Sequence, residues 1–236
     1  MRARDFQKSP ISLESGALFI ADAHYQKGVR EELEALIDRL LQESPPQLFL
    51  MGDIFDLLVG DIPSTINMNE PLVEKLQKLS NSCECHYFEG NHDFNLSEIF
   101  PKMRVYPRQA QPAIFLAGSK RVALSHGDLF VDKSYDRYID TIRKKWVLKI
   151  LNLLDVGGWI VKWIQRYNAS KNLCQTIENF EKIIAQKKRH YPDVDLIVEG
   201  HFHQNYFSQS YINLPSYACG KEVVLFDGKT FSFSRM

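Results

Sequence analysis

Residues 17–24 read ALFIADAH: an apolar run followed at once by an aspartate and a histidine. The same order recurs at residues 48–53, LFLMGD, and at residues 86–93, HYFEGNHD. Short apolar runs rich in aromatic or β-branched residues predict buried strands, and the polar residues mark where each strand ends. Two later runs, at 122–126 and 196–201, each end in a histidine. The sequence therefore predicts buried strands that deliver polar side chains at their ends.

Helices are predicted between the first three strands. Residues 29–42 place leucine and isoleucine at helical spacing, and Pro45 with Pro46 ends that pattern. A shorter helix is expected at residues 72–79. Alternation of strand and helix favours parallel pairing, in which the carboxyl ends of the strands meet along one edge. We therefore expect the polar side chains to converge in one crevice.

The C-terminal part has a different pattern. Residues 206–211, 223–226 and 231–233 alternate as antiparallel strands do, and Asp227-Gly228 is suited to a tight turn. A second sheet built from this tail and packed on the first predicts an α/β protein, a four-layer α/β/β/α sandwich. We expect a single domain over residues 1–236, with a helical-hairpin cap inserted at about 130–190.

Composition restricts the partners. The chain has 236 residues, of which 44% are hydrophobic, so it can bury the core of one domain. Its 29 basic and 29 acidic residues cancel, which leaves no global field for nucleic acid, and no nucleic acid partner is expected. Residues 1–15 are polar and no long apolar run follows, so we expect a cytoplasmic protein whose four cysteines are reduced and packed.

The residue types at the strand ends are those of a metal site. Five of the seven histidines lie there, among aspartates and one asparagine. Carboxylate, amide and imidazole ligands together suit manganese, iron, cobalt or zinc. In Asp22-x-His24 and His201-x-His203 a spacing of two places both side chains on one side of an extended segment. A carboxylate that bridges two cations holds them about 3.5–4 Å apart, and Asp53 is the expected bridge.

Five motifs in this order resemble those of the calcineurin-like metallophosphoesterase superfamily: Asp22-x-His24, Gly52-Asp53-x-x-Asp56, Gly90-Asn91-His92-Asp93, His126-Gly127-Asp128 and Gly200-His201-x-His203. The resemblance implies two divalent metal ions, preferably manganese. It places Asp22, His24, Asp53 and His203 on the first ion and Asp53, Asn91, His126 and His201 on the second. A hydroxide between the ions would attack phosphorus in line.

Other residues of the motifs have supporting roles in this interpretation. His92 is expected to stabilise the leaving oxygen or the transition state, so that His92, Asp53 and Asn91 form the catalytic set. Asp56 and Asp93 are expected to orient metal-binding residues, and Asp128 either to orient a ligand or to cap the next helix. Each motif alone also has a structural explanation, such as helix capping by Asp22 or a turn at Gly52.

The insertion is basic and rich in tryptophan. Residues 141–170 contain six lysines or arginines, one acid and all three tryptophans, with Gly157-Gly158 between two helical pieces. A basic amphipathic hairpin of this kind can lie on a membrane or enclose acyl chains. A packed helix pair or a dimer contact explains the same pattern.

Residues 128–132, Tyr135, residues 143–146 and residues 168–171 resemble the capped branch that contains UDP-2,3-diacylglucosamine diphosphatase of lipid A synthesis. That resemblance implies hydrolysis of a lipid-linked sugar nucleotide to lipid X and UMP, manganese dependence, and peripheral association with the cytoplasmic face of the inner membrane. It suggests five substrate contacts: Asp132, Tyr135, Asn168, Ser170 and Lys171. The chain departs from that branch at His92, where its best-known members carry arginine.

Two other functions agree with the residues. The first is a soluble phosphodiesterase or phosphatase for nucleotides or other small phosphate esters, in which the hairpin serves only as packing. The second is an interaction module that keeps the metal scaffold without catalysis. The sequence predicts no particular oligomeric state.

Overall fold

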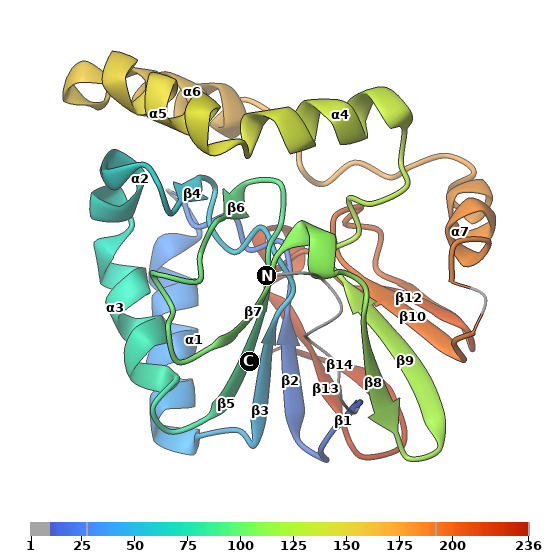
Figure 1. Cartoon of the computed structure of the whole chain (residues 1–236). Coiled ribbons are helices and arrows are strands. Elements are labelled where there is room, and N and C mark those ends of the chain that lie inside the picture. The colour runs from blue at the N-terminus through green and yellow to red at the C-terminus, as the bar shows by residue number, and fades with distance from the viewer. Residues whose placement is uncertain (1–9, 27, 192, 236) are drawn as a thin grey trace.

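Two six-stranded sheets lie face to face between layers of helices in the computed structural model, which describes residues 10–26, 28–191 and 193–235 (Figure 1). The first sheet has the order β14 (Phe231–Arg235), β13 (Glu222–Phe226), β2 (Ala17–Ile20), β3 (Gln47–Leu50), β5 (Glu84–Phe88), β7 (Arg104–Tyr106). The second has the order β1 (Ile11–Ser12), β8 (Ala113–Ala117), β9 (Lys120–Ser125), β10 (Leu196–Glu199), β12 (Tyr211–Asn213), β11 (Tyr206–Phe207). The predicted α/β sandwich is confirmed.

The core between the sheets follows from the two-residue period of the strands. In β2, Phe19 faces the second sheet and stacks on Phe49 of β3, with ring centroids 4.4 Å apart. Leu18 and Ile20 point the other way, toward the helices of the first sheet. Both faces of β2 and β3 are therefore apolar, which is why these strands appear in the sequence as continuous apolar runs rather than alternating ones.

Helices cover both outer faces. Helix α1 (Arg30–Glu43) and helix α3 (Glu70–Leu79) bury their apolar stripes on the first sheet, and α7 (Phe180–Lys188) covers the second. Both helices expected near the N-terminus are confirmed, within two residues at each end. Among the residues that the structure describes, no helix combines the length and the apolar character needed to cross a membrane.

The assignment of strands to sheets differs from the prediction. The tail does not build the second sheet by itself: β13 pairs with β2 and extends the first sheet, whereas β11 and β12 join β10 in the second. The centre of the second sheet consists of β8, β9 and β10, with β9 and β10 parallel in register from Leu196 with Val122 to Glu199 with Ser125. Apolar patterning predicts that a strand is buried but carries no information about its neighbour.

Three helices cross above the carboxyl ends of the strands, as Figure 1 shows: α4 (Lys133–Ile142), α5 (Lys145–Leu154) and α6 (Trp159–Ala169). We call them the cap helices. Residues 156–158 form a short 3-10 turn between α5 and α6, in which Gly157 and Gly158 both have positive φ. Leu148 and Val161 pack on Val59 of β4 (Leu58–Val59), on Phe94 of β6 (Asp93–Phe94) and beside α2 (Pro63–Met68).

A buried ion pair holds the chain where it returns from the cap helices. Lys187 of α7 and Glu199 of β10 are both fully buried, and Lys187 Nζ lies 3.5 Å from Glu199 Oε2. The same ammonium group donates to the backbone carbonyls of Gly127 and Leu129. The pair therefore fixes the loop that follows β9.

We predict that Lys187→Met lowers the free energy of unfolding by about 3 kcal/mol, because it leaves the Glu199 carboxylate buried without its cation. Urea denaturation checks this value. Lys188→Met is the matched control, since Lys188 is exposed and its Nζ donates to Ser210 Oγ at the surface. Equal midpoints for the two variants would show that the ion pair does not hold the fold.

Candidate active site

The polar side chains at the strand ends meet at one edge, and both sheets contribute to it. Asp22 and His24 follow β2, Asp53 follows β3, and Asn91 and His92 follow β5. The second sheet supplies His126 after β9 and both His201 and His203 after β10. The structure thus brings together all seven residues that were predicted as metal ligands, together with His92.

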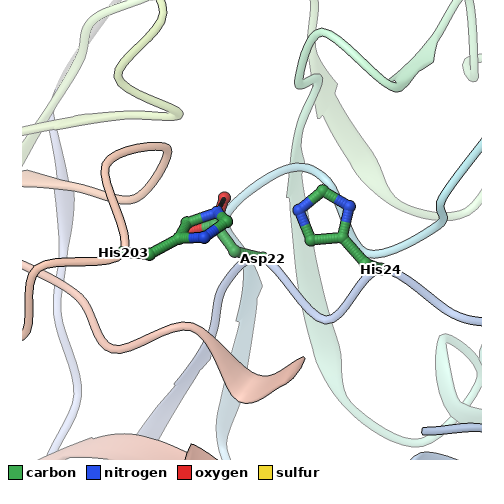
Figure 2. Close-up of side chains that lie close together, drawn as sticks. All are labelled: Asp22, His24 and His203. Atoms are coloured by element: carbon green, nitrogen blue, oxygen red, sulfur yellow. Dashed lines mark ion pairs between the residues drawn. The ribbon is translucent and has the colours of Figure 1, made fainter. Parts of the chain in front are cut away.

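Three groups of these residues place nitrogen or carboxylate oxygen atoms within 4.8 Å of one another. They consist of Asp22, His24 and His203 (Figure 2), of His24, Asp53 and His92, and of Asp53, His126 and His201. Asp53 belongs to two of the groups, which is the arrangement that a bridging carboxylate requires. The second group was not predicted, because His92 was expected to stand outside the ligand set.

Asp22 links the two histidines that follow β10. Its Oδ1 lies 3.2 Å from His203 Nε2, and its carboxylate accepts the backbone N–H of His201. The other ring nitrogen of His203 is 2.7 Å from the carbonyl oxygen of Leu173. That contact makes Nδ1 the protonated nitrogen and leaves Nε2 directed at the site.

Asp53 and His126 are arranged in a similar way. His126 Nδ1 lies 2.9 Å from the carbonyl oxygen of Met51, so its Nε2 is directed at the site, 3.5 Å from Asp53 Oδ2 and 3.3 Å from Asn91 Oδ1. Asp53 Oδ1 accepts the backbone N–H of His92 at 2.8 Å. The carbonyl partner of Nδ1 fixes the tautomer in which a histidine binds metal through Nε2.

The backbone of the site is unusual. Five of the candidate ligands, Asp22, His24, Asp53, His201 and His203, have φ between 44° and 66°. Aspartate and histidine are tolerated in this left-handed region, although it costs about 1–2 kcal/mol for each residue other than glycine. Such turns point consecutive side chains into one crevice instead of to opposite faces of a strand.

Two glycines allow the close approach of the ligand side chains. A Cβ on Gly90 would lie 2.2 Å from Asp53 Oδ1, and one on Gly52 would lie 2.4 Å from His126 Nδ1. Neither neighbour is able to move, because each is held by its own hydrogen bonds. These positions therefore require glycine on steric grounds.

Asp93 holds the loops together beneath the site. Its fully buried carboxylate accepts the backbone N–H groups of Asp53, Ile54 and Gly90 and the hydroxyl of Tyr87, at distances of 2.6 to 3.0 Å. Burial, followed by the charge of Asp53, raises the pKa of Asp93 to about 7. Asp93 thus positions Asp53 and the Asn91 loop, in agreement with its expected supporting role.

The histidines differ in their protonation. Burial holds the pKa values of His24 and His201 well below the ordinary value, so both are neutral, which is the form that binds metal. Burial alone would also lower the pKa of His203, but the adjacent Asp22 carboxylate outweighs it and raises this pKa to about 9. His203 must therefore release a proton when it binds a cation.

The donor set fits divalent cations. Both ring nitrogens of His24 are buried and have no hydrogen-bond partner among the described residues, although a buried polar group is normally paired. Asp56 Oδ1 lies 3.9 Å from His24 Nδ1, beyond hydrogen-bond distance. Carboxylates, imidazoles and an amide oxygen are the ligands of manganese, iron, cobalt and zinc, and a cation at His24 would complete its bonding.

The end of α6 reaches the site through Asn168. This buried amide donates to the carbonyl oxygen of Asp56, and its nitrogen lies 3.2 Å from His92 Nδ1. His92 Nδ1 itself is 2.8 Å from the same carbonyl oxygen. Asn168 was expected to contact substrate; the structure places it against His92 and in the lining of the cavity beneath the cap helices.

The other proposed substrate contacts divide into two sets. Tyr135 and Lys171 line a cavity beneath the cap helices together with Asn91 and His92, and the hydroxyl of Tyr135 is buried without a partner among the described residues. Asp132 caps α4 by accepting the backbone N–H groups of Ser134 and Tyr135. Ser170 donates to the carbonyl oxygen of Tyr167. Neither Asp132 nor Ser170 lines the cavity.

Sequence reasoning missed an arginine that anchors the cap helices. Arg108 is buried and contacts Asp128, Asp136 and Asp140; its Nε donates to Asp128 Oδ2 at 2.9 Å. Asp128 therefore pairs with Arg108 and caps no helix. Nothing in the sequence near Arg108 marks this contact, because its partners lie 20 or more positions away.

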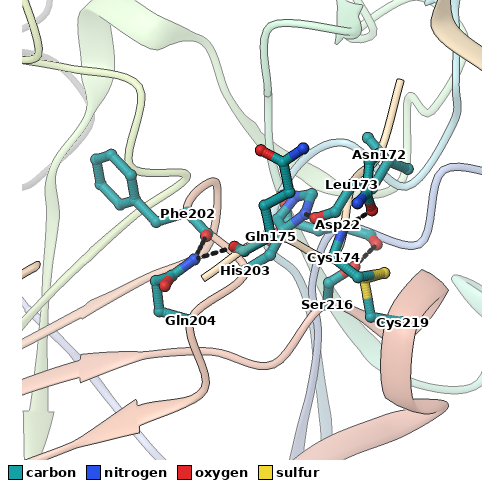
Figure 3. Close-up of a disulfide and its surroundings, with 10 residues drawn as sticks. All are labelled: Asp22, Asn172, Leu173, Cys174, Gln175, Phe202, His203, Gln204, Ser216 and Cys219. Carbon is teal, nitrogen blue, oxygen red and sulfur yellow. Dashed lines mark hydrogen bonds and ion pairs between the residues drawn. A yellow bond between two sulfur atoms is a disulfide. The ribbon is translucent and has the colours of Figure 1, made fainter. Parts of the chain in front are cut away.

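The prediction of four reduced cysteines is wrong. Cys174 and Cys219 form a disulfide, whereas Cys83 and Cys85 are free. Figure 3 shows the disulfide beside Leu173 and Ser216. The carbonyl oxygen of Leu173 accepts from His203 Nδ1, and the hydroxyl of Ser216 donates to the carbonyl oxygen of Asp22. The two half-cystines are 45 positions apart with no recognisable spacing, so only the fold reveals their pairing.

Comparisons with known proteins agree with this geometry. The family model for calcineurin-like phosphoesterases matches residues 17–205. A UDP-2,3-diacylglucosamine hydrolase of Haemophilus influenzae (strain PittGG) is 25% identical over 202 residues, 81% of this chain and 84% of that protein. Another of this name, from Edwardsiella ictaluri, is 27% identical over 198 residues, 79% of this chain and 75% of that protein.

Among solved structures, a dimetal phosphatase from Danio rerio aligns with a TM-score of 0.44 at 13% identity, covering 96% of each chain. The family model spans most of this chain, including every strand end that forms the site. The chain belongs to the calcineurin-like phosphoesterases and is a metal-dependent hydrolase of phosphorus esters or anhydrides.

Proposed function

We propose that the protein hydrolyses the pyrophosphate bond of UDP-2,3-diacylglucosamine, with two divalent ions, preferably manganese. The oxygen of a water molecule bonds to one phosphorus of the pyrophosphate, and the bond from that phosphorus to the bridging oxygen breaks. The bridging oxygen stays on the other phosphorus and takes up a proton of the water, and the products are UMP and 2,3-diacylglucosamine 1-phosphate. The relatives described above carry this substrate in their names. The observation that favours it most is an apolar cavity that opens on His92.

The apolar cavity lies between the cap helices and the core and has a volume of about 670 Å³. Its walls are mostly aliphatic and aromatic, with Leu148, Leu151, Ile160, Ile164 and Trp163 on the side of the cap helices. Asn91 and His92 lie in the same lining. Apolar walls with a few polar groups at one end suit a ligand with acyl chains and a phosphate head.

The chain's own residues suggest how the site works. Bound divalent ions would supply an activated water and positive charge for the developing oxyanion. The histidines and aspartates around Asp53 would hold those ions, with Asn91 contributing its amide oxygen. The carbonyl of Asp56 accepts from both His92 Nδ1 and the Asn168 amide, which fixes the His92 ring; in its imidazolium form, His92 would donate from Nε2 to the leaving oxygen.

We further propose that the cap helices rest on the cytoplasmic face of a membrane. Trp146 and Trp159 are each 60% exposed, and Leu153 and Val156 are 78% and 79% exposed. Lys145 and Lys149 are exposed on α5. Exposed tryptophans among basic residues suit an anionic lipid interface. The Cys174–Cys219 disulfide is the feature that favours an oxidising compartment instead.

For the membrane contact, we predict that the double variant Trp146→Ser with Trp159→Ser binds vesicles of anionic phospholipid at least about tenfold more weakly, because each buried apolar side chain contributes about 1.5–3 kcal/mol. Co-sedimentation measures the binding. Phe233→Ser is the control, since Phe233 is exposed on β14. Unchanged sedimentation of the double variant would exclude this contact.

For the metal centre, Asp53→Asn should lower both metal content and turnover, since it removes a negative charge shared by two ligand groups. His92→Ala should keep the metal and reduce kcat by about 100-fold or more, the usual contribution of a proton donor. Metal analysis and turnover of bis(4-nitrophenyl) phosphate give both quantities. Loss of metal from His92→Ala would show that His92 is a ligand.

The substrate is tested by manganese-dependent release of UMP from UDP-2,3-diacylglucosamine, with ordinary UDP-sugars and bis(4-nitrophenyl) phosphate assayed beside it. We expect kcat/KM for the acylated substrate to exceed that for UDP-sugars by about 100-fold or more, since two buried acyl chains contribute several kcal/mol. Ile164→Asp, which places a charge in the apolar cavity, should remove that preference. Equal turnover of acylated and unacylated compounds would instead indicate a soluble phosphodiesterase.

A further inference from the structure

A second cavity lies on the other side of α6. It has a volume of about 770 Å³ and is lined from the core by Tyr25, Gln26 and Arg30 and from α6 by Lys162, Gln165 and Arg166. Charged and amide side chains lie on both of its walls, whereas aliphatic and aromatic side chains predominate in the apolar cavity. Helix α6 thus separates one apolar and one polar cavity.

Both cavities reach the candidate metal centre. Asp56 lines the polar cavity, and its Oδ1 is 3.9 Å from His24 Nδ1. Asn168 lines the apolar cavity and donates to the carbonyl oxygen of Asp56. A ligand that extends from one cavity to the other must therefore pass the site near His24 and His92.

The charges of the polar cavity are unevenly neutralised. Arg30, Lys162 and Arg166 form no ion pair with a carboxylate in the described parts of the chain; the guanidinium of Arg30 lies over the ring of Tyr25, 4.8 Å from its centroid. Of the acidic residues in the lining, Glu32 pairs with Lys221 at 3.9 Å, and Asp56 accepts from the amide of Asn168. Glu31 forms no ion pair with a described residue, and it is the one acid of the lining that could compete with an anion for the three cations. Two cations from the cap helices and one from α1 remain free to meet an anion.

We propose that this polar cavity binds the nucleoside monophosphate half of the substrate. The inference rests on the proposed function, because it assigns the half that the apolar cavity does not take. Arginine and lysine donate charge-assisted hydrogen bonds to phosphate oxygens, and Gln26 and Gln165 offer both donors and acceptors to a base or ribose. With acyl chains on one side of α6 and the nucleotide on the other, the pyrophosphate lies at the metal centre.

UMP binding tests the assignment directly. Arg166→Ala, on the exposed face of α6, should weaken binding of UMP by about tenfold, which corresponds to one lost charged hydrogen bond of about 1.4 kcal/mol. Isothermal titration calorimetry of the intact protein with UMP, uridine and inorganic phosphate measures it. Arg137→Ala is the matched control, since Arg137 is exposed on α4 and lines neither cavity.

Kinetics separate this proposal from the preceding one. Arg166→Ala should raise KM for UDP-2,3-diacylglucosamine by a similar factor, whereas the control Arg137→Ala should leave both this KM and turnover of bis(4-nitrophenyl) phosphate unchanged. Equal UMP affinity in Arg166→Ala, Lys162→Ala and Arg137→Ala would overturn the assignment, as would inorganic phosphate binding as tightly as UMP. UMP binding that depends on Arg166, in a protein that does not hydrolyse the acylated compound, would support the nucleotide cavity and refute the proposed substrate.

Discussion

A single buried carboxylate fixes the geometry on which the site depends. Asp93 sits beneath the loops that follow β3 and β5 and accepts backbone N–H groups from both of them, as well as the hydroxyl of Tyr87. Without these bonds several backbone donors would be buried with no partner, at a cost of about 1–3 kcal/mol each. The positions of Asp53 and Asn91 therefore follow from one side chain that touches no substrate.

The cap helices are inserted between two residues of the same metal centre. The chain leaves the second sheet after His126, crosses the site as α4, α5 and α6, and returns through α7 to His201. Lys187 of α7 donates to the loop after His126. Arg108 binds Asp128 of the same loop and the aspartates of α4, so both ends of the insertion are attached to this loop. The residues of the apolar cavity and the candidate metal ligands can thus vary in sequence independently, while Asn168 still connects the two sets through His92.

Local chemistry was predictable from the sequence, and long-range pairing was not. The ends of β2, β3, β5, β9 and β10 were recognised because an apolar run and its polar terminus are adjacent in the chain, and their convergence follows from parallel strands. The sheet to which β13 belongs, the Cys174–Cys219 bond and the contacts of Arg108 depend on partners distant in sequence. Of the expected substrate contacts, Asp132 caps α4 and lies away from the apolar cavity, whereas Asn168 lines that cavity and also contacts His92.

The left-handed backbone at five candidate ligands lowers the free energy of unfolding, so the site costs the fold stability. Each such residue costs about 1–2 kcal/mol of conformational strain, which the surrounding hydrogen bonds must offset. Glycine in place of Asp22 or His24 would relieve this strain while abolishing the ligand. Relatives that lose catalysis are thus expected to gain thermal stability at these positions, and consensus design for heat resistance would select against the residues that make the protein an enzyme.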